Sequence, residues 1–434
     1  MRVAMAINWN LDASSLTNIA RNNFRELGKL MNQTKSFTIS AIGIQSVSVG
    51  DFNQHFDLLH IPNMGGYKFA LNAVIHCDNI ILGCSGIDEI IYGEDILVWK
   101  GSWKAVKKEI SNQLGLWKKY LDKIKQIHVP ANSELEEFHK YLDMPYEKIS
   151  VIHHGVNHSF FKPSTDKEST RKKITSKLNI PNSPYFLHIG ENNYVRKNLK
   201  RLGQAFSQAK KSGLKHNLII AGKHYPEIEN ELSKIDGIFF LDWISDDDLL
   251  QLIQGSEAFI LPSIHEGFGM PLVESMACGI PCVSCNQHAP PEIILDSGLL
   301  VDPYNIDEIS NSMLQLYNDK KLLNDLSTKS LSRSQDFSWQ KNAEEILKLY
   351  QIDPSKPMEN FEKQYDLAAY RTLVSVCDMF PDPKQNLIDS ILRFDYLDLL
   401  DWAVHHGLKN AKTRDFLLPF ENWYHNKFEE LSKQ

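Results

Sequence analysis

The sequence lacks the features that would place the protein across a membrane, outside the cell or on nucleic acid. No run of about 18 apolar residues occurs, so no transmembrane helix is expected. Residues 1–9 form a short apolar segment without the charged start and cleavage site of a secretion signal. The formal charge of −7 gives no reason to expect nucleic acid as a partner. We therefore expect a cytoplasmic protein, with peripheral contact to the cytoplasmic membrane face as an alternative.

Metal-ligand patterns are also scarce. The chain has six cysteines in 434 residues and no secretion signal, so free thiols are expected. Cys278, Cys282 and Cys285 lie close in sequence, but no fourth ligand follows at zinc-finger spacing, and buried packing explains them better. The acidic run 246–248 follows Ser245 and is typical of a capped helix start. No metal site and no cofactor are therefore predicted.

A G-x-G-x-x-G motif after the first strand is absent, which argues against a nicotinamide-dependent dehydrogenase. The sequence instead shows two series of short apolar runs that alternate with helix-period segments. The first series is RVAMAI, FTISAIGI, FDLLHI, NIILGC, KQIHVP and KISVIHHGV, and the second is YFLHIG, NLIIAG, IFFLDWI, AFILPS, IPCVSC and SGLLVDP. Helices are expected between them, for example over 17–32, 102–124, 198–212 and 247–255. Strands alternating with helices predict two α/β domains, each a doubly wound, Rossmann-like parallel sheet.

Breaks in this pattern suggest the domain organisation. The polar stretch FKPSTDKESTRKK, from Phe161 onward, predicts a linker. We expect a first domain over 1–163, a second domain over 164–353 and a helical extension over 354–434. The extension has three possible roles, which are packing on the first domain, recognising the acceptor or forming an oligomer.

The densest signal for a site lies in residues 259–303. A buried strand delivers Glu266 and the segment Gly267–Gly269 into a loop, and a helix carrying Glu274 follows. In doubly wound sheets the ligand crevice lies beyond the carboxyl ends of the strands, which is where this loop falls. Its glycines let the backbone approach a ligand closely. The free N–H groups at the helix start can bind a diphosphate. One carboxylate is expected to meet sugar hydroxyls and the other a ribose diol.

A second signal is FLHIGENNYVRKNLKRLGQAF. It reads as a strand, a turn at Gly190, and then Arg196 and Lys197 just before a helix. Two fixed cations can hold a diphosphate and stabilise the charge that develops as the bond to the sugar breaks. Taken alone, an Arg-Lys pair is more typical of a solvated surface.

These motifs occur in order with HHGVN, PPEI, LLVDP and FSW across roughly residues 149–350. Together they resemble the retaining family 4 glycosyltransferases. The resemblance implies a GT-B architecture, in which two Rossmann-like domains face a cleft. The N-terminal domain, 1–163, would then be the acceptor domain, and 164–353 the nucleotide-sugar-binding domain. It also implies transfer of a hexose, glucosyl or mannosyl, from a UDP- or GDP-sugar, with retention of configuration and without an obligatory metal.

The resemblance further assigns residues to roles. Arg196 and Lys197 would bind the diphosphate and Glu266 the donor sugar, which makes these three the expected catalytic residues. Glu274 would hold the ribose. The remaining donor-binding positions would be Gly190, Gly267, Phe268, Gly269 and Met270.

The first domain departs from the family pattern in two places. Where relatives have a glycine-rich loop after the first strand, this chain has NWNLDASSLTNIARN, in which Ser14, Ser15 or Asn18 would approach phosphates or a serine would cap a helix. Where relatives carry a His-Asp pair, it has Ser85 and Gly86.

Four residues of the first domain are candidates for the acceptor and sugar side of the cleft. Ser85 replaces the family histidine, and Asp88 lies close enough in sequence to compensate for the lost pair. His60 and His154 follow strands, although a histidine at a strand end is more often structural.

The segment 102–124 is a lysine-rich amphipathic helix. Such a helix can lie on an anionic membrane, where lipid-linked acceptors reside, or can pack its apolar stripe on the domain core. The acceptor is expected to be a glycan, a lipid-linked saccharide or a protein. The functional alternatives are a catalytically altered GT-B protein that binds a glycan or partner, and a sugar-nucleotide epimerase.

Overall fold

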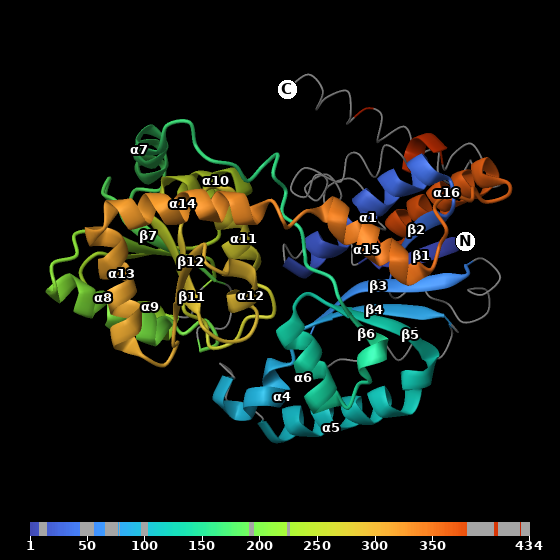
Figure 1. Cartoon of the computed structure of the whole chain (residues 1–434), viewed down its shortest axis with the longest axis horizontal. Coiled ribbons are helices and arrows are strands. Elements are labelled where there is room, and N and C mark those ends of the chain that lie inside the picture. Colours follow the sequence, from blue (N-terminus) through green and yellow to red (C-terminus); the bar gives the residue numbers. More distant parts are fainter. Residues whose placement is uncertain are drawn as a thin grey trace.

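The computed structural model describes residues 1–7, 15–43, 56–65, 77, 79–96, 103–190, 195–223, 226–379, 403–406 and 426. Ser14 and the side chains of Ser15 and Asn18, which were candidates for phosphate contact, lie outside this part of the chain. The described residues form two six-stranded sheets with helices packed around them (Figure 1). The predicted α/β fold class is confirmed.

The first sheet has the order β2-β1-β3-β4-β5-β6, and all its neighbouring strands are parallel. Its strands are β1 (Arg2–Ile7), β2 (Thr38–Gly43), β3 (Leu58–Gly65), β4 (Ile80–Ser85), β5 (Ile124–Val129) and β6 (Ile149–Val151). Its helices include α1 (Ser15–Thr34), α4 (Asp88–Tyr92), α5 (Trp103–Tyr120) and α6 (Asn132–Leu142). Each strand corresponds to one of the six apolar runs of the first series.

The second sheet has the order β12-β11-β10-β7-β8-β9 and is also parallel. Its strands are β7 (Tyr185–Ile189), β8 (Asn217–Ala221), β9 (Ile238–Leu241), β10 (Ala258–Leu261), β11 (Cys282–Cys285) and β12 (Gly298–Val301). Its helices are α7 (Lys167–Lys177), α8 (Leu199–Lys211), α9 (Pro226–Leu232), α10 (Asp246–Gly255), α11 (Met270–Ala277), α12 (Pro290–Ile294), α13 (Ile306–Asn318) and α14 (Lys320–Ser334). Chain order reverses between β7 and β10, so the ligand crevice of this domain should open at their carboxyl ends.

The linker between the sheets is shorter than the polar composition suggested. Helix α7 begins at Lys167, inside the stretch predicted as linker. The Asp166 carboxylate accepts a hydrogen bond from the backbone N–H of Ser169 at 3.0 Å, which is a helix N-cap. A good cap therefore starts a helix in a segment whose polarity alone indicated a loop.

The C-terminal helices return to the first sheet. Helices α15 (Trp339–Tyr350) and α16 (Phe361–Met379) lie beside α1 and β2 (Figure 1). Ile346, Tyr350 and Leu373 share one buried core with Val3 and Phe37. Of the three roles considered for the extension, packing on the first domain is the one that its described residues show. Helix α15 contributes to the same core, although it falls within residues 164–353.

Helix α5 packs its apolar stripe inward, as one of the two alternatives predicted. Trp117 and Ile110 are buried, while Lys107, Lys108 and Lys118 remain exposed. The membrane-contact alternative therefore gains no support from the packing. Among the described residues, no helix combines the length and apolarity needed to cross a bilayer.

The structural readings of the cysteines and of the acidic run are confirmed where the chain is described. Five of the six cysteines are free and buried. Burial raises the pKa of the Cys278 and Cys285 thiols to about 12, so they stay protonated. The Ser245 hydroxyl accepts from the backbone N–H of Asp248 and caps α10.

His60 is a core residue. Its Nδ1 lies 2.7 Å from the Tyr350 hydroxyl on α15, and its Nε2 lies 2.9 Å from Nε2 of His128 on β5. Burial, with repulsion from His128, lowers the pKa of His60 well below its usual value, and burial lowers the pKa of His128 to about 4. The expectation that His60 faces the cleft is wrong, because the side chain is fully buried.

We expect Tyr350→Phe to lower the free energy of unfolding by about 1–3 kcal/mol, because it leaves Nδ1 of the buried His60 without its partner. Chemical denaturation at pH 7 measures the change. Tyr304→Phe, at a side chain exposed on the surface, is the matched control and should change stability by less than about 0.5 kcal/mol. Equal effects in the two variants would mean that the hydroxyl contributes no specific stabilisation.

Candidate active site

The carboxyl ends of β7 and β10 place two loops side by side in the second domain. Gly190 follows β7, and a Cβ there would lie 2.8 Å from Nε2 of His188. Gly269 precedes α11 with a φ of 87°, a conformation that favours glycine. Asn198 holds the start of α8 near β10, because its side-chain amide donates to the carbonyls of Pro262 and Pro303. These contacts fix the backbone on both sides of the basic pair.

A buried ion pair occupies this position. Nζ of Lys197 lies 2.7 Å from Oε1 of Glu266, and Nη1 of Arg196 lies 3.6 Å from the same oxygen. Arg196 also donates to the carbonyl of His265 at 3.1 Å. The structure thus brings Arg196, Lys197 and Glu266 together from two distant motifs.

The ion pair shifts the pKa values of both of its members. Burial alone would raise the pKa of Glu266, but Lys197 and Arg196 outweigh it and lower this pKa to about 2. Burial lowers the pKa of Lys197, and the charge of Glu266 opposes that effect. Glu266 is therefore a carboxylate in a site that excludes most water.

Glu274 differs from Glu266. It lies on α11, and burial together with repulsion from Asp246 raises its pKa to about 7. No hydrogen bond or ion pair joins it to Arg196, Lys197 or Glu266 among the described residues. A carboxyl group that is poorly solvated gains from hydrogen-bond donors, such as the two hydroxyls of a ribose.

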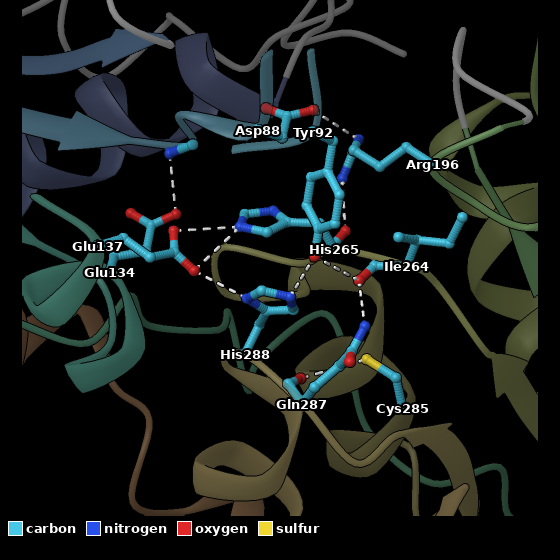
Figure 2. Close-up of polar contacts among 11 residues, drawn as sticks. Asp88, Tyr92, Glu134, Glu137, Arg196, Ile264, His265, Cys285, Gln287 and His288 are labelled. Carbon is cyan, nitrogen blue, oxygen red and sulfur yellow. Dashed lines mark hydrogen bonds and ion pairs between the residues drawn. The ribbon is translucent and has the colours of Figure 1, made fainter. Parts of the chain in front are cut away.

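Asp88 is a residue of the first domain that contacts Arg196. This residue begins α4, two positions after the Ser85-Gly86 turn that ends β4. Its Oδ2 lies 3.7 Å from Nε of Arg196, across the gap between the domains (Figure 2). Ser85 is half-buried and is the last residue of β4.

His154 and Phe268 pack at the junction of the two domains. Their rings lie 5.0 Å apart, and Phe268 also contacts Phe337. Burial, with repulsion from neighbouring histidines, lowers the pKa of His154 to about 3. Both side chains are buried, so Phe268 offers a ligand only its backbone, and the expectation that His154 faces a ligand gains no support. Met270 begins α11 and is half-buried.

The motifs HHGVN and FSW meet at the crossover between the domains. A Cβ on Gly155 would lie 2.1 Å from the backbone nitrogen of Trp339, so this position requires glycine. Val156 donates to the carbonyl of Phe337 at 3.3 Å and forms a β-bridge with Ser338. These residues hold the chain where it leaves and re-enters the first domain.

The glutamate of PPEI makes a second contact between the domains. The Glu292 carboxylate accepts hydrogen bonds from the backbone and side chain of Asn132, both at 2.8 Å. It also lies 2.6 Å from Nε2 of His153. Glu292 therefore ties the start of α6 and the HHGVN segment to the second domain.

Sequence reasoning missed Glu134 on α6. Its Oε1 accepts from the backbone N–H of Gly86 at 2.8 Å (Figure 2), and a Cβ on Gly267 would lie only 2.0 Å from that oxygen. Burial and repulsion from Glu137 raise the pKa of Glu134 well above its usual value. A buried carboxyl group with a raised pKa thus lies between the Ser85-Gly86 turn and the glycines after Glu266.

Glu137, one turn further along α6, was missed as well. Its carboxylate lies 3.1 Å from Nε2 of His265 and 2.8 Å from Nδ1 of His288 (Figure 2). Nε2 of His288 in turn lies 2.6 Å from the Tyr92 hydroxyl. No spacing rule joins these residues in the sequence, because they come from four separate segments.

A cavity of about 650 Å³ lies elsewhere, between α1 and the start of α15. Arg21, Arg25, Asn157 and Trp339 are among the residues that line it. None of the predicted site residues does, so the ion pair and not the size of this cavity locates the candidate site.

Comparison with known proteins agrees with this fold. Residues 169–333 match the family described as glycosyl transferases group 1. The O-antigen chain mannosyltransferase B of Escherichia coli is 29% identical over 217 residues, which are 44% of this chain and 56% of that protein. The chain thus aligns with little more than half the length of this curated relative.

Two solved structures show the same fold. The sucrose-phosphate synthase of Thermosynechococcus elongatus superposes with a TM-score of 0.60 at 16% identity, covering 81% of this chain and 98% of that one. The Anabaena protein HepE, solved with UDP and glucose, gives 0.59 at 15% identity, covering 81% and 99%.

The two sheets and their helices therefore form the GT-B architecture of glycosyltransferases. Within that class, residues 169–333 match the group 1 glycosyltransferases, and the resemblance found in the sequence is confirmed.

The depressed pKa of Glu266 predicts a pH-dependent stability. Because the pKa of about 2 in the folded state is below the ordinary value of 4.5, the ionised carboxylate stabilises the fold above pH 4.5, and this contribution is lost as pH falls towards 2. Between pH 6 and 3 the wild type should lose about 2 kcal/mol more than Glu266→Gln. Urea denaturation at both pH values measures this. The exposed Glu227→Gln should follow the wild type, and an unchanged pH slope in Glu266→Gln would contradict the ion pair.

For Glu274 we predict a pH dependence of stability with the opposite sign. Its pKa of about 7 in the folded state is above the ordinary value of 4.5, so the carboxyl group ionises more readily in the unfolded chain. The free energy of unfolding therefore falls as pH rises from 4.5 to 7. Glu274→Gln should therefore be more stable than the wild type at pH 8 by about 1–3 kcal/mol, and similar to it at pH 5. Thermal melts at the two pH values test this, and a variant destabilised equally at both would refute it.

Proposed function

We propose that this chain is a retaining glycosyltransferase that moves a hexose from a nucleotide diphosphate-sugar to a hydroxyl group of a saccharide acceptor. The observation that carries the proposal is the buried Lys197–Glu266 ion pair, with Arg196 beside it. It lies at the strand-order reversal of the second domain of a GT-B fold, where such sheets bind ligands.

In this proposal Arg196 and Lys197 bind the diphosphate. As the bond between the anomeric carbon and the phosphate oxygen breaks, negative charge develops on the departing phosphate. Two cations that the fold already holds in place stabilise this charge without reorganising. They replace the divalent ion that other transferases use, so the diphosphate needs no metal.

The two carboxyl groups of the motif take different roles. Glu266 is ionised and accepts hydrogen bonds from hydroxyls of the donor sugar, together with the backbone at Gly267–Gly269. Glu274, with its raised pKa, accepts from the ribose. Asp88 approaches Arg196 from the first domain and closes the sugar end of the site.

Retention is best explained by a front-face path. A double displacement requires an ionised carboxylate as the nucleophile on the opposite face of the sugar. Glu134, the buried carboxyl between Gly86 and Gly267, has a strongly raised pKa and is a poor nucleophile. In the front-face path the acceptor oxygen bonds to the anomeric carbon on the side that the phosphate leaves, and the departing phosphate takes the acceptor proton.

A mannosyl donor is the first choice. The curated relative at 29% identity is named a mannosyltransferase of O-antigen chains. HepE, solved with UDP and glucose, supports the fold at only 15% identity, so a glucosyl donor comes second. A bacterial surface glycan is accordingly the first acceptor class to test.

A donor screen separates this proposal from its alternatives. The full chain is incubated with GDP-mannose, UDP-glucose and related donors, with and without mannose oligosaccharides, and released nucleotide and products are measured. We expect acceptor-dependent release of nucleotide and an elongated saccharide. Conversion to an isomeric sugar nucleotide without acceptor would show an epimerase, and binding without turnover would show a glycan-binding protein.

Lys197→Ala should lower kcat by about 10²–10³, because it removes a preorganised charge that acts on the transition state. Glu266→Gln should also lower turnover sharply. Steady-state kinetics with circular dichroism as the folding check measures both. Lys200→Ala, at an exposed lysine on α8, is the control and should keep near-normal activity. Near-normal activity in both site variants would refute the assigned roles.

A further inference from the structure

Three metal-binding side chains meet at the domain junction, outside the ion pair. Glu137 comes from α6 of the first domain, and His265 and His288 follow β10 and β11 of the second. One ligand atom of each lies within 4.8 Å of the others. His265 and Glu137 are buried, and His288 is nearly so.

Their geometry suits a small cation. Two imidazole nitrogens and a carboxylate oxygen are a usual donor set for zinc, with bonds of about 2.0–2.2 Å. Tetrahedral coordination at these lengths puts neighbouring donor atoms about 3.3 Å apart. The carboxylate oxygens of Glu137 lie 3.1 and 3.2 Å from Nε2 of His265, and one lies 2.8 Å from Nδ1 of His288. The two imidazole nitrogens lie no more than 4.8 Å apart, and binding would draw all three donor atoms to the tetrahedral spacing.

The surroundings already orient the ligands. The Tyr92 hydroxyl lies 2.6 Å from Nε2 of His288, which leaves Nδ1 directed at Glu137 (Figure 2). Metal-binding histidines commonly use the second ring nitrogen for such an outer hydrogen bond. On the other side, Arg196 donates to the carbonyl of His265 and holds that loop.

We propose that Glu137, His265 and His288 bind one Zn²⁺ ion that clamps the two domains together. One ligand belongs to the first domain and two to the second, so the ion bonds across the cleft. A water molecule would complete the four-coordinate site. The diphosphate stays with Arg196 and Lys197, and the ion is a structural clamp. Without metal, the same residues form a hydrogen-bonded contact, which is the competing account.

Zinc binding is tested on the full chain after chelator treatment, without nucleotide or acceptor. Titration calorimetry and metal analysis should show one Zn²⁺ per chain, with a rise in Tm. His288→Ala should abolish this binding, and Tyr92→Phe should weaken it about 10–100-fold through the lost outer hydrogen bond. Glu136→Gln, next to Glu137 on α6, is the matched control and should bind as the wild type does.

Two results would overturn the proposal. One is the absence of stoichiometric Zn²⁺ binding in a wild type that circular dichroism shows to be folded, which would leave only the hydrogen-bonded contact. The other is binding that His288→Ala does not change, which would place the ion elsewhere. Small-angle scattering adds a check on the clamp, since Zn²⁺ should compact the wild type and not His288→Ala. These measurements need no turnover, so their failure is distinct from failure of the transferase proposal.

Discussion

The candidate site depends on one buried ion pair between Lys197 and Glu266. Moving either charge out of water is expensive, and the mutual attraction offsets that cost only if the geometry is well held. The fold holds it through parallel strands that end at the same edge of the sheet, and through Asn198, which ties the start of α8 to the loops after β10 and β12. The fold thus holds Arg196 and Lys197 in fixed positions before any ligand arrives, as the proposed stabilisation of a diphosphate requires.

The same principle explains why two glutamates of one motif behave in opposite ways. Glu266 and Glu274 are both removed from water, and burial alone would raise both pKa values. Cations surround Glu266, whereas the charge acting on Glu274 is the carboxylate of Asp246. Glu266 is thus ionised at any physiological pH, whereas Glu274 ionises only around neutrality. The motif places the two carboxyl groups, and their neighbours decide what each can do.

Much of the fold could be predicted from the sequence, because strands and helix starts show as patterns of neighbouring residues. Buried parallel strands are apolar throughout, so all twelve appear as apolar runs, and Ser245 marks its helix start by local hydrogen bonding. Contacts between distant segments could not be predicted in the same way. His60 closes an apolar run and was a cleft candidate for that reason, but β3 continues to Gly65, and Tyr350 of α15, nearly 300 positions later, covers the side chain. Glu134 and Glu137 look like ordinary helix-surface charges, and only the meeting of the two domains buries them.

The residues around Gly86, where the first domain departs from the family pattern, lie close together in the structure. Gly86 has a φ of 70°, and its N–H donates to Glu134, whose Oε1 fits against Gly267 only because that residue has no side chain. Asp88, two positions later, approaches Arg196. At the position where the resemblance implied a His-Asp pair, this chain therefore has carboxyl groups and close-packed backbone. Under the proposed transferase function, these contacts are the first domain's contribution to the donor site.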